Sequence, residues 1–432
     1  MRFLFSGGDI DRTREARPVL IIPGMTSTAL EVWRGVGCYA DATRQRVWSS
    51  RGSTATFLLD PECLQKHLGL NGSTWDDPEG IRVRAASGLS SADAFGPLNL
   101  WGEFIVNLAL LGYDESKLEI AAYDWRLDAT RLESRDRYFT RLRRAVETLR
   151  ETNGLQKVAI VSHSLGSNHA LFFFSWVEHQ QPGWVDAHVE SLTTVGGAFL
   201  GAPKCLPYLV SGEMTDALHF GEIFAALSEL HGGLSRDALV ALTRSWGSVA
   251  NLLPKGGDRL WRTPLYDHRH HKKTKQDDDK DLLLSEEVVA PLLEIVDEAN
   301  ASKTKASFGP DDTMRFLRNV APRYMSLVDD EYDLDGAAAK KNREEEGGKK
   351  KQLQEELWKT WSNPLVAPLP NASNLKLYCL YGVGRPTPRT IRFAPLAQRK
   401  QVRVHADGAL DDDSSGGASS SGGASSSGGA SS

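Results

Sequence analysis

Short apolar runs alternate with segments of helical periodicity along the first half of the chain. The runs at 19–22, 118–125 and 157–164 are rich in β-branched and aliphatic residues, as in strands buried on both faces. Residues 135–154 lie between the last two runs and end in Asn-Gly, a common helix stop. Their apolar side chains recur at helical spacing, at Tyr138, Phe139, Leu142, Val146 and Leu149. Strand, helix and strand in this order predict a right-handed crossover and a parallel sheet.

Two later apolar runs, at 189–199 and 375–384, predict further strands. Because about 180 residues separate them, we expect an α/β domain over 17–410 with a cap inserted at about 200–370. A short extension, 1–16, precedes this domain. The Gly/Ser/Ala repeat at 411–432 cannot bury a core and is predicted to be disordered.

Two charged segments interrupt the predicted cap. Residues 267–281 contain a cluster of histidines inside a charge run, which is compatible with a metal site but more typical of a solvated loop. We therefore expect no metal there. Residues 336–360 are rich in Lys and Glu and predict an exposed helix or linker.

Composition narrows the class of protein. The chain has 432 residues, 51 basic and 56 acidic side chains and a net charge of −5, which argues against nucleic acid as a partner. No apolar run approaches the roughly 18 residues of a membrane span, and the N-terminus lacks a signal-peptide core. We expect a soluble chain as written, or one whose anchor lies upstream. The four cysteines show no CxxC spacing.

The candidate nucleophile is Ser164, in the sequence Ser-His-Ser-Leu-Gly at 162–166. A serine on a strained strand-to-helix turn needs small residues two positions away on either side, commonly as G-x-S-x-G. Ser162 replaces the first glycine and is small enough to fit. An ordinary loop serine is the alternative, but a strand before Ser164 and an apolar helix after it favour the nucleophile.

A serine nucleophile also needs two backbone N–H groups that stabilise an oxyanion. The first is expected from Leu165, the residue after the nucleophile. The second is expected from Met25, because Gly24 allows a sharp turn after the strand at 19–22. A plain Pro-Gly turn is the alternative interpretation, and the presence of Ser164 favours the oxyanion hole.

Several longer motifs resemble the lecithin:cholesterol acyltransferase family. They are PVLIIPGMTSTALEVW, AAYDWRLDATRLESRDRYFTRL, HSLGS, FLGAPKCLPYLVSGEMTDAL, RSWGSVANLLPKGGDRLW and YCLYGVGRPTPRT, in family order over about 17–390. The resemblance implies an α/β-hydrolase fold with a lid and a cap. It also implies transfer of an acyl group from the sn-2 position of a phospholipid to diacylglycerol through an acyl-serine, without a cofactor.

The resemblance also assigns residues outside the serine turn. Cys38 to Cys63 match the family's lid, and the two cysteines are either a disulfide or unrelated thiols. Trp125 is assigned to the substrate region, packed under the active site. Asp124 precedes the serine, whereas the fold places its acid after it, so Asp124 is expected to stabilise a loop together with Arg126.

The sequence does not provide a clear acid and histidine for a catalytic triad. The family's acid lies in a DGDGTVP-like motif after the strand at 375–384, and this chain lacks that motif. Asp407 is the nearest candidate acid, and His405 precedes it, which is the wrong order. A serine without a base is a poor nucleophile. The chain is interpreted as C-terminally truncated, or else as a catalytically inactive lipid-binding domain; a phospholipase is the third alternative.

The implied substrates determine the expected location. Phospholipid and diacylglycerol reside in bilayers, so we expect membrane association, in the endoplasmic reticulum or a plastid. The lid offers Trp48, Phe57, Leu58 and Leu59 as apolar side chains that could enter the interface.

Overall fold

The computed structural model describes residues 16–49, 60–92, 101–213, 235–261, 291–297, 300, 302–334, 357–384 and 389–394. These residues belong to one compact unit of the chain, 1–397. The predicted loop at 267–281, most of the charged segment at 336–360 and the tail at 411–432 lie outside the described residues.

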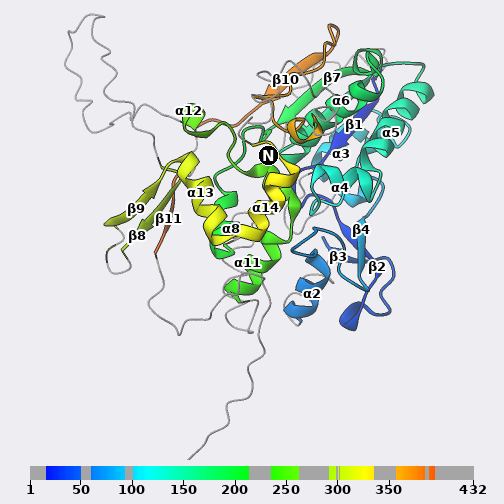
Figure 1. Cartoon of the computed structure of the whole chain (residues 1–432). Helices are drawn as coiled ribbons and strands as arrows, with labels where there is room; N and C mark the ends of the chain where they lie inside the picture. The colour runs from blue at the N-terminus through cyan, green and yellow to red at the C-terminus, as the bar shows by residue number, and fades with distance from the viewer. Residues whose placement is uncertain are drawn as a thin grey trace, which may run out of the picture. The chain divides into compact units, whose positions relative to one another are not determined.

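A five-stranded sheet forms the centre of this unit (Figure 1). Its strand order is β10-β7-β6-β1-β5, and every neighbouring pair is parallel, which confirms the predicted α/β-hydrolase-like fold. The strands are β1 (Val19–Ile22), β5 (Leu118–Ile120), β6 (Val158–His163), β7 (Val189–Val195) and β10 (Lys376–Leu380). β5 is shorter than the predicted 118–125 because its one partner, β1, ends before Pro23, which has no N–H to donate.

Helices cover both faces of the sheet. On one face, α5 (Tyr138–Thr152), α6 (Leu165–Gln180) and α7 (Trp184–His188) join the main hydrophobic core. On the other, α3 (Gly102–Leu110) packs over β1 and β5. The five apolar positions predicted for the helix at 135–154 are all buried, so the periodicity correctly identified the core side of α5.

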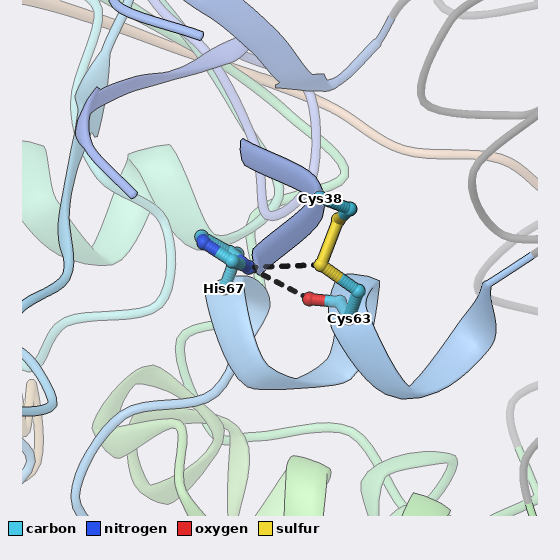
Figure 2. A group of neighbouring side chains, drawn as sticks. All are labelled: Cys38, Cys63 and His67. Carbon is cyan, nitrogen blue, oxygen red and sulfur yellow. Dashed lines mark hydrogen bonds between the residues drawn. A yellow bond between two sulfur atoms is a disulfide. The ribbon is translucent and has the colours of Figure 1, made fainter. Parts of the chain in front are cut away.

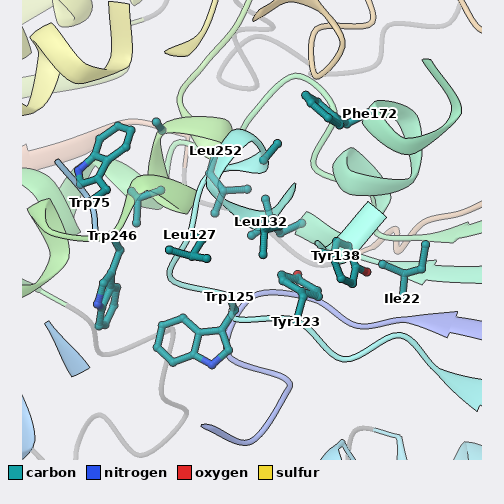
Figure 3. Packing of buried hydrophobic residues seen from close by; sticks show 14 of the residues in the cluster. Ile22, Trp75, Tyr123, Trp125, Leu127, Leu132, Tyr138, Phe172, Trp246 and Leu252 are labelled. Carbon is teal, nitrogen blue, oxygen red and sulfur yellow. The ribbon is translucent and has the colours of Figure 1, made fainter. Parts of the chain in front are cut away.

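The main core is rich in aromatic side chains (Figure 3). Phe139 of α5 stacks on Phe172 of α6 with ring centroids 4.8 Å apart. Trp125 contacts Trp48 on one side and Trp246 on the other, at 5.2 and 5.0 Å. Large aromatic rings bury 150–250 Å² each, so these contacts contribute much of the stabilisation of the fold.

Two small sheets were not predicted. The first has the order β3-β2-β4 and consists of β2 (Leu30–Arg34), β3 (Gln45–Trp48) and β4 (Arg82–Ala85). The second has the order β11-β8-β9 and consists of β8 (Leu293–Val296), β9 (Thr304–Phe308) and β11 (Ile391–Phe393). Their strands have three to five residues, too few for a clear alternation in the sequence.

The interval between β7 and β10 coincides with the predicted cap. It contains α8 (Cys205–Ser211), α11 (Arg236–Arg244), η3 (Gly247–Leu252), α12 (Gly257–Trp261), α13 (Pro310–Val320), α14 (Pro322–Glu331) and η4 (Leu357–Thr360). In the described part of the chain, the other helices are η1 (Gly37–Tyr39), α2 (Pro61–Leu68), η2 (Leu89–Ser91) and α4 (Ala129–Ser134). The division into domains stays a prediction. Among the described helices, none has the length and apolarity to cross a bilayer.

Candidate active site

Ser164 lies at the junction of β6 and α6, in a backbone conformation that L-residues rarely adopt. Its φ is 51° and its ψ is −123°, and its side chain makes no capping hydrogen bond to α6. Such strain persists only where the surroundings fix it, and it is the geometry of a nucleophile elbow. The Ser164 N–H donates to the Val195 carbonyl at the end of β7, at 3.0 Å.

Close packing explains why small residues flank Ser164. A Cβ atom on Gly166 would lie 2.2 Å from the Pro23 carbonyl oxygen, so α6 begins directly against the end of β1. Ser162, which replaces the usual first glycine, is fully buried with its hydroxyl 3.0 Å from that of Ser167. Serine is therefore accommodated there, because its polar group has a partner.

The loop after β1 lies against the nucleophile. A Cβ atom on Gly24 would be 3.1 Å from the Ser164 Cβ and 2.7 Å from Nδ1 of His163. Met25, the next residue, is partly buried. Leu165 is the first residue of α6, where backbone N–H groups have no intrahelical acceptor. The two expected N–H donors thus lie in segments on either side of Ser164.

Side chains from two other segments hold this loop, the segment after β5 and the end of β3. The Tyr123 hydroxyl donates to the Pro23 carbonyl at 2.9 Å. Trp125 is fully buried, and its indole N–H donates to the Thr28 carbonyl at 3.1 Å. Trp48 donates to the Thr26 carbonyl at 2.8 Å, so this aromatic residue is bonded to the loop. The assignment of Trp125 to substrate binding stays a prediction.

Asp124 is a structural carboxylate. It is fully buried and forms a bidentate ion pair with Arg126, with N···O distances of 2.7 and 2.8 Å. Arg135 adds a third contact at 2.6 Å. Burial by itself would raise the pKa of Asp124, but the two guanidinium groups outweigh it and hold that pKa well below its usual value. Because both of its oxygens bind guanidinium groups, the Asp124 carboxylate has a structural role.

Cys38 and Cys63 form a disulfide that joins η1 to α2 (Figure 2). His67 lies next to it, and the three residues are a group whose possible ligand atoms lie within 4.8 Å of one another. Both sulfurs are bonded to each other, however. The Nε2 atom of His67 accepts from the Val36 N–H at 3.2 Å, and Nδ1 lies 2.7 Å from the Cys63 carbonyl. The disulfide and His67 therefore hold the segment at 36–38 against α2, and we call this arrangement the clamp. It does not fit a metal.

An apolar cavity of about 400 Å³ lies along α6, beside β7 and β10. Its α6 lining comes from Leu171 and Ser175, seven and eleven residues after Ser164. At 1.5 Å rise per residue these positions are roughly 10 to 16 Å along the helix from the serine. The β7 lining, by contrast, includes Thr194, the residue before Val195, whose carbonyl accepts the Ser164 N–H.

The comparison with known sequences decides the family. A profile of the family described as "Lecithin:cholesterol acyltransferase" matches residues 43–420. The chain belongs to this family. It is 34% identical over 382 residues to a phospholipid:diacylglycerol acyltransferase from Schizosaccharomyces pombe, covering 87% of this chain and 57% of that protein.

Two further relatives give the same picture. A phospholipid:diacylglycerol acyltransferase from Saccharomyces cerevisiae is 34% identical over 391 residues, covering 86% of this chain and 55% of that protein. A putative phospholipid:diacylglycerol acyltransferase 2 from Arabidopsis thaliana is 31% identical over 481 residues, covering 93% and 70%. The chain thus spans little more than half the length of the two yeast relatives.

Within this member of the lecithin:cholesterol acyltransferase family, the acid and base of a triad have no described counterpart. Asp407 and His405 lie outside the described residues, as do Phe57 and Leu58 of the predicted membrane contact. The histidines that the structure describes are His67, His163, His169, His179 and His188. None of them hydrogen-bonds to the Ser164 hydroxyl in the described part of the chain. His163, adjacent to the serine, is half-buried, and its desolvation lowers its pKa.

Sequence reasoning missed one group of this family member, a buried polar cluster at Asn168, Asn251 and Lys255. Asn and Lys are usually exposed, so a sequence pattern assigns them to the surface.

Proposed function

We propose that this chain carries the core of an O-acyltransferase that moves a fatty acyl group from the sn-2 position of a phospholipid to diacylglycerol. The observation that supports it is the strained Ser164, flanked by the Gly24–Met25 loop and by the first turn of α6. The identity to phospholipid:diacylglycerol acyltransferases supports the choice of donor and acceptor.

The reaction has two ester exchanges. In the first, Ser164 Oγ bonds to the acyl carbonyl carbon, the ester bond to the glycerol oxygen breaks, and the serine proton ends on the lysophospholipid hydroxyl. In the second, the diacylglycerol hydroxyl attacks the acyl-serine, its proton returns to Ser164, and triacylglycerol leaves. The Met25 and Leu165 N–H groups stabilise the oxyanion formed in both steps, and one such donor contributes about 3 to 4 kcal/mol.

The remaining assignments complete the proposal. Asp407 is the proposed acid of the triad, and the disulfide-bonded segment from Cys38 to Cys63 is the proposed lid. The enzyme acts at a membrane surface, where both substrates reside. The disulfide favours an oxidising compartment, such as the lumen of the endoplasmic reticulum, over a plastid.

A labelled-phospholipid assay tests this function. The chain is incubated with vesicles that contain sn-2-labelled phospholipid and unlabelled diacylglycerol, and labelled triacylglycerol and free fatty acid are measured separately. We expect triacylglycerol, and we expect Ser164→Ala to abolish it. Free fatty acid alone would identify a phospholipase instead. No product from the wild-type chain, with retained vesicle binding, would identify an inactive lipid-binding domain.

A further inference from the structure

Lys255 is fully buried in the segment that follows η3. Its amine donates to the Asn251 carbonyl at 2.5 Å and lies 3.3 Å from the Asn251 side-chain oxygen. Its backbone N–H donates to the Leu200 carbonyl at 2.9 Å. A lysine amine loses hydration when it is buried, so its position must be fixed by such hydrogen bonds.

Asn251 connects Lys255 to α6 through a second hydrogen bond. Its side-chain oxygen accepts from Nδ2 of Asn168 at 3.1 Å, and both asparagines are fully buried. Nδ2 of Asn168 also donates to the Ala198 carbonyl at 2.9 Å. Asn168 is four residues after Ser164, which is about one helical turn. The cluster therefore begins one turn from the candidate nucleophile.

The cluster holds the loop that leaves β7. The loop follows Val195, the last residue of β7, whose carbonyl accepts the Ser164 N–H; it meets Asn168 at Ala198 and Lys255 at Leu200. The N–H of Ala202 donates to the Leu252 carbonyl at 2.8 Å. Gly201 lies so close to this segment that an added Cβ would be 2.3 Å from the Leu253 carbonyl oxygen, and its φ is +92°. The loop is thus attached to η3 and its following residues along its whole second half.

We propose that Lys255 is a positioning residue, which keeps the loop after β7 at a fixed distance from Ser164 through Asn251 and Asn168. This inference rests on the proposed function. The strained Ser164 backbone is retained partly by its hydrogen bond to Val195, whose place the central sheet fixes through β6 and β10. Ser164 keeps this bond only if the first turn of α6 is held, and Asn168 holds that turn through Ala198 and Asn251. A looser loop moves the serine hydroxyl relative to Met25 and Leu165, whose N–H groups must meet the oxyanion.

A methionine in place of Lys255 would fill the same space without the amine. Burial lowers the pKa of Lys255 to about 7, so near neutral pH both protonation states are present. The neutral amine keeps two N–H donors, and the hydrogen bonds to Asn251 survive in either state. A buried amine is costly, but its removal also leaves the buried Asn251 carbonyl without its shortest hydrogen bond, so Lys255→Met should fold with lower stability than the wild type.

The test compares Lys255→Met with Lys305→Met, a surface control whose lysine pairs with Asp297 at 2.9 Å in the small sheet of β8 and β9. We expect Lys255→Met to lower kcat for triacylglycerol formation by about 10- to 100-fold with KM unchanged, as for a small displacement of a reacting group. We also expect the Ser164 amide to exchange its hydrogen at least tenfold faster. The control should change neither.

An unchanged kcat together with unchanged exchange at Ser164 would overturn the proposal. The exchange measurement does not depend on activity, so it decides the role of Lys255 even if Ser164→Ala shows that the proposed function is wrong. If Lys255→Met fails to fold, Asn168→Ala removes the link to Ala198 with the lysine in place. Faster exchange at Ser164 in that variant supports the proposal, and wild-type exchange contradicts it.

Discussion

A Cβ atom on Gly166 would lie 2.2 Å from the carbonyl oxygen of Pro23 and 2.5 Å from that of Ile22. The helix that carries the candidate nucleophile therefore contacts the end of the neighbouring strand through its backbone. The same strand end continues into Gly24 and Met25, so this close contact is one of those that set the distance between the serine and the expected oxyanion hole.

Gly166→Ala should consequently separate α6 from β1. Extra volume in a packed position costs about 1 to 3 kcal/mol, and here the opposing atoms are backbone that cannot rotate away. We expect a lower free energy of unfolding in chemical denaturation and a loss of acyl transfer larger than the loss of folded protein. Gly72→Ala is the matched control, because no atom lies within 4 Å of its added Cβ. Equal stability of the two variants would contradict this packing.

Asp124→Asn should destabilise the fold by about 3 to 5 kcal/mol, because it leaves the buried guanidinium of Arg126 without a full counter-charge. The free energy of unfolding measures this. The pKa of Asp124 is lowered in the folded state, so its stabilisation is present above the unfolded pKa of about 4 and is lost as the pH falls below it. A variant that stays fully stable but inactive would instead indicate a catalytic carboxylate.

His169 should make the fold sensitive to mild acid. It is fully buried between aromatic rings, and burial lowers its pKa to about 3. Below about pH 6.5, His169 therefore binds a proton in the unfolded chain but not in the folded chain. The free energy of unfolding consequently falls as the pH drops from 6.5 toward 3. We expect the melting temperature of His169→Phe to depend less on pH over this range than that of the wild type. His179→Phe, an exposed site on the same helix, should leave the wild-type slope unchanged.

Loss of the Cys38–Cys63 disulfide should lower stability by about 3 kcal/mol, because the two cysteines are separated by 25 residues. The double variant Cys38→Ser, Cys63→Ser should show this loss of stability in thermal unfolding. Adding a dithiol reductant to the double variant should have no further effect. Cys379→Ser, which removes an exposed free thiol, is the control. If the clamped segment is the lid, KM for phospholipid rises in the double variant. A disulfide-free chain with wild-type melting would contradict the clamp.

The sequence was most informative where local periodicity and burial coincide. All five strands of the central sheet and the core positions of α5 follow from apolar runs, and the serine turn follows from small residues at fixed spacing. Interactions between distant segments leave no such pattern. Arg135 completes the charge balance of Asp124 from beyond α4, and the buried amine of Lys255 donates to the Asn251 carbonyl. Each depends on the three-dimensional fold for its partner.

β10 pairs with β7 although about 180 residues separate the end of one from the start of the other. During synthesis at 5 to 20 residues per second, this interval takes roughly 10 to 40 seconds. If β5, β1, β6 and β7 pair before β10 is synthesised, β7 is for that time the outer strand of the sheet, with its hydrogen-bonding edge open to other chains. A nascent chain of this architecture must therefore be shielded on the ribosome until β10 has emerged, and slow translation across the cap lengthens its exposure to aggregation.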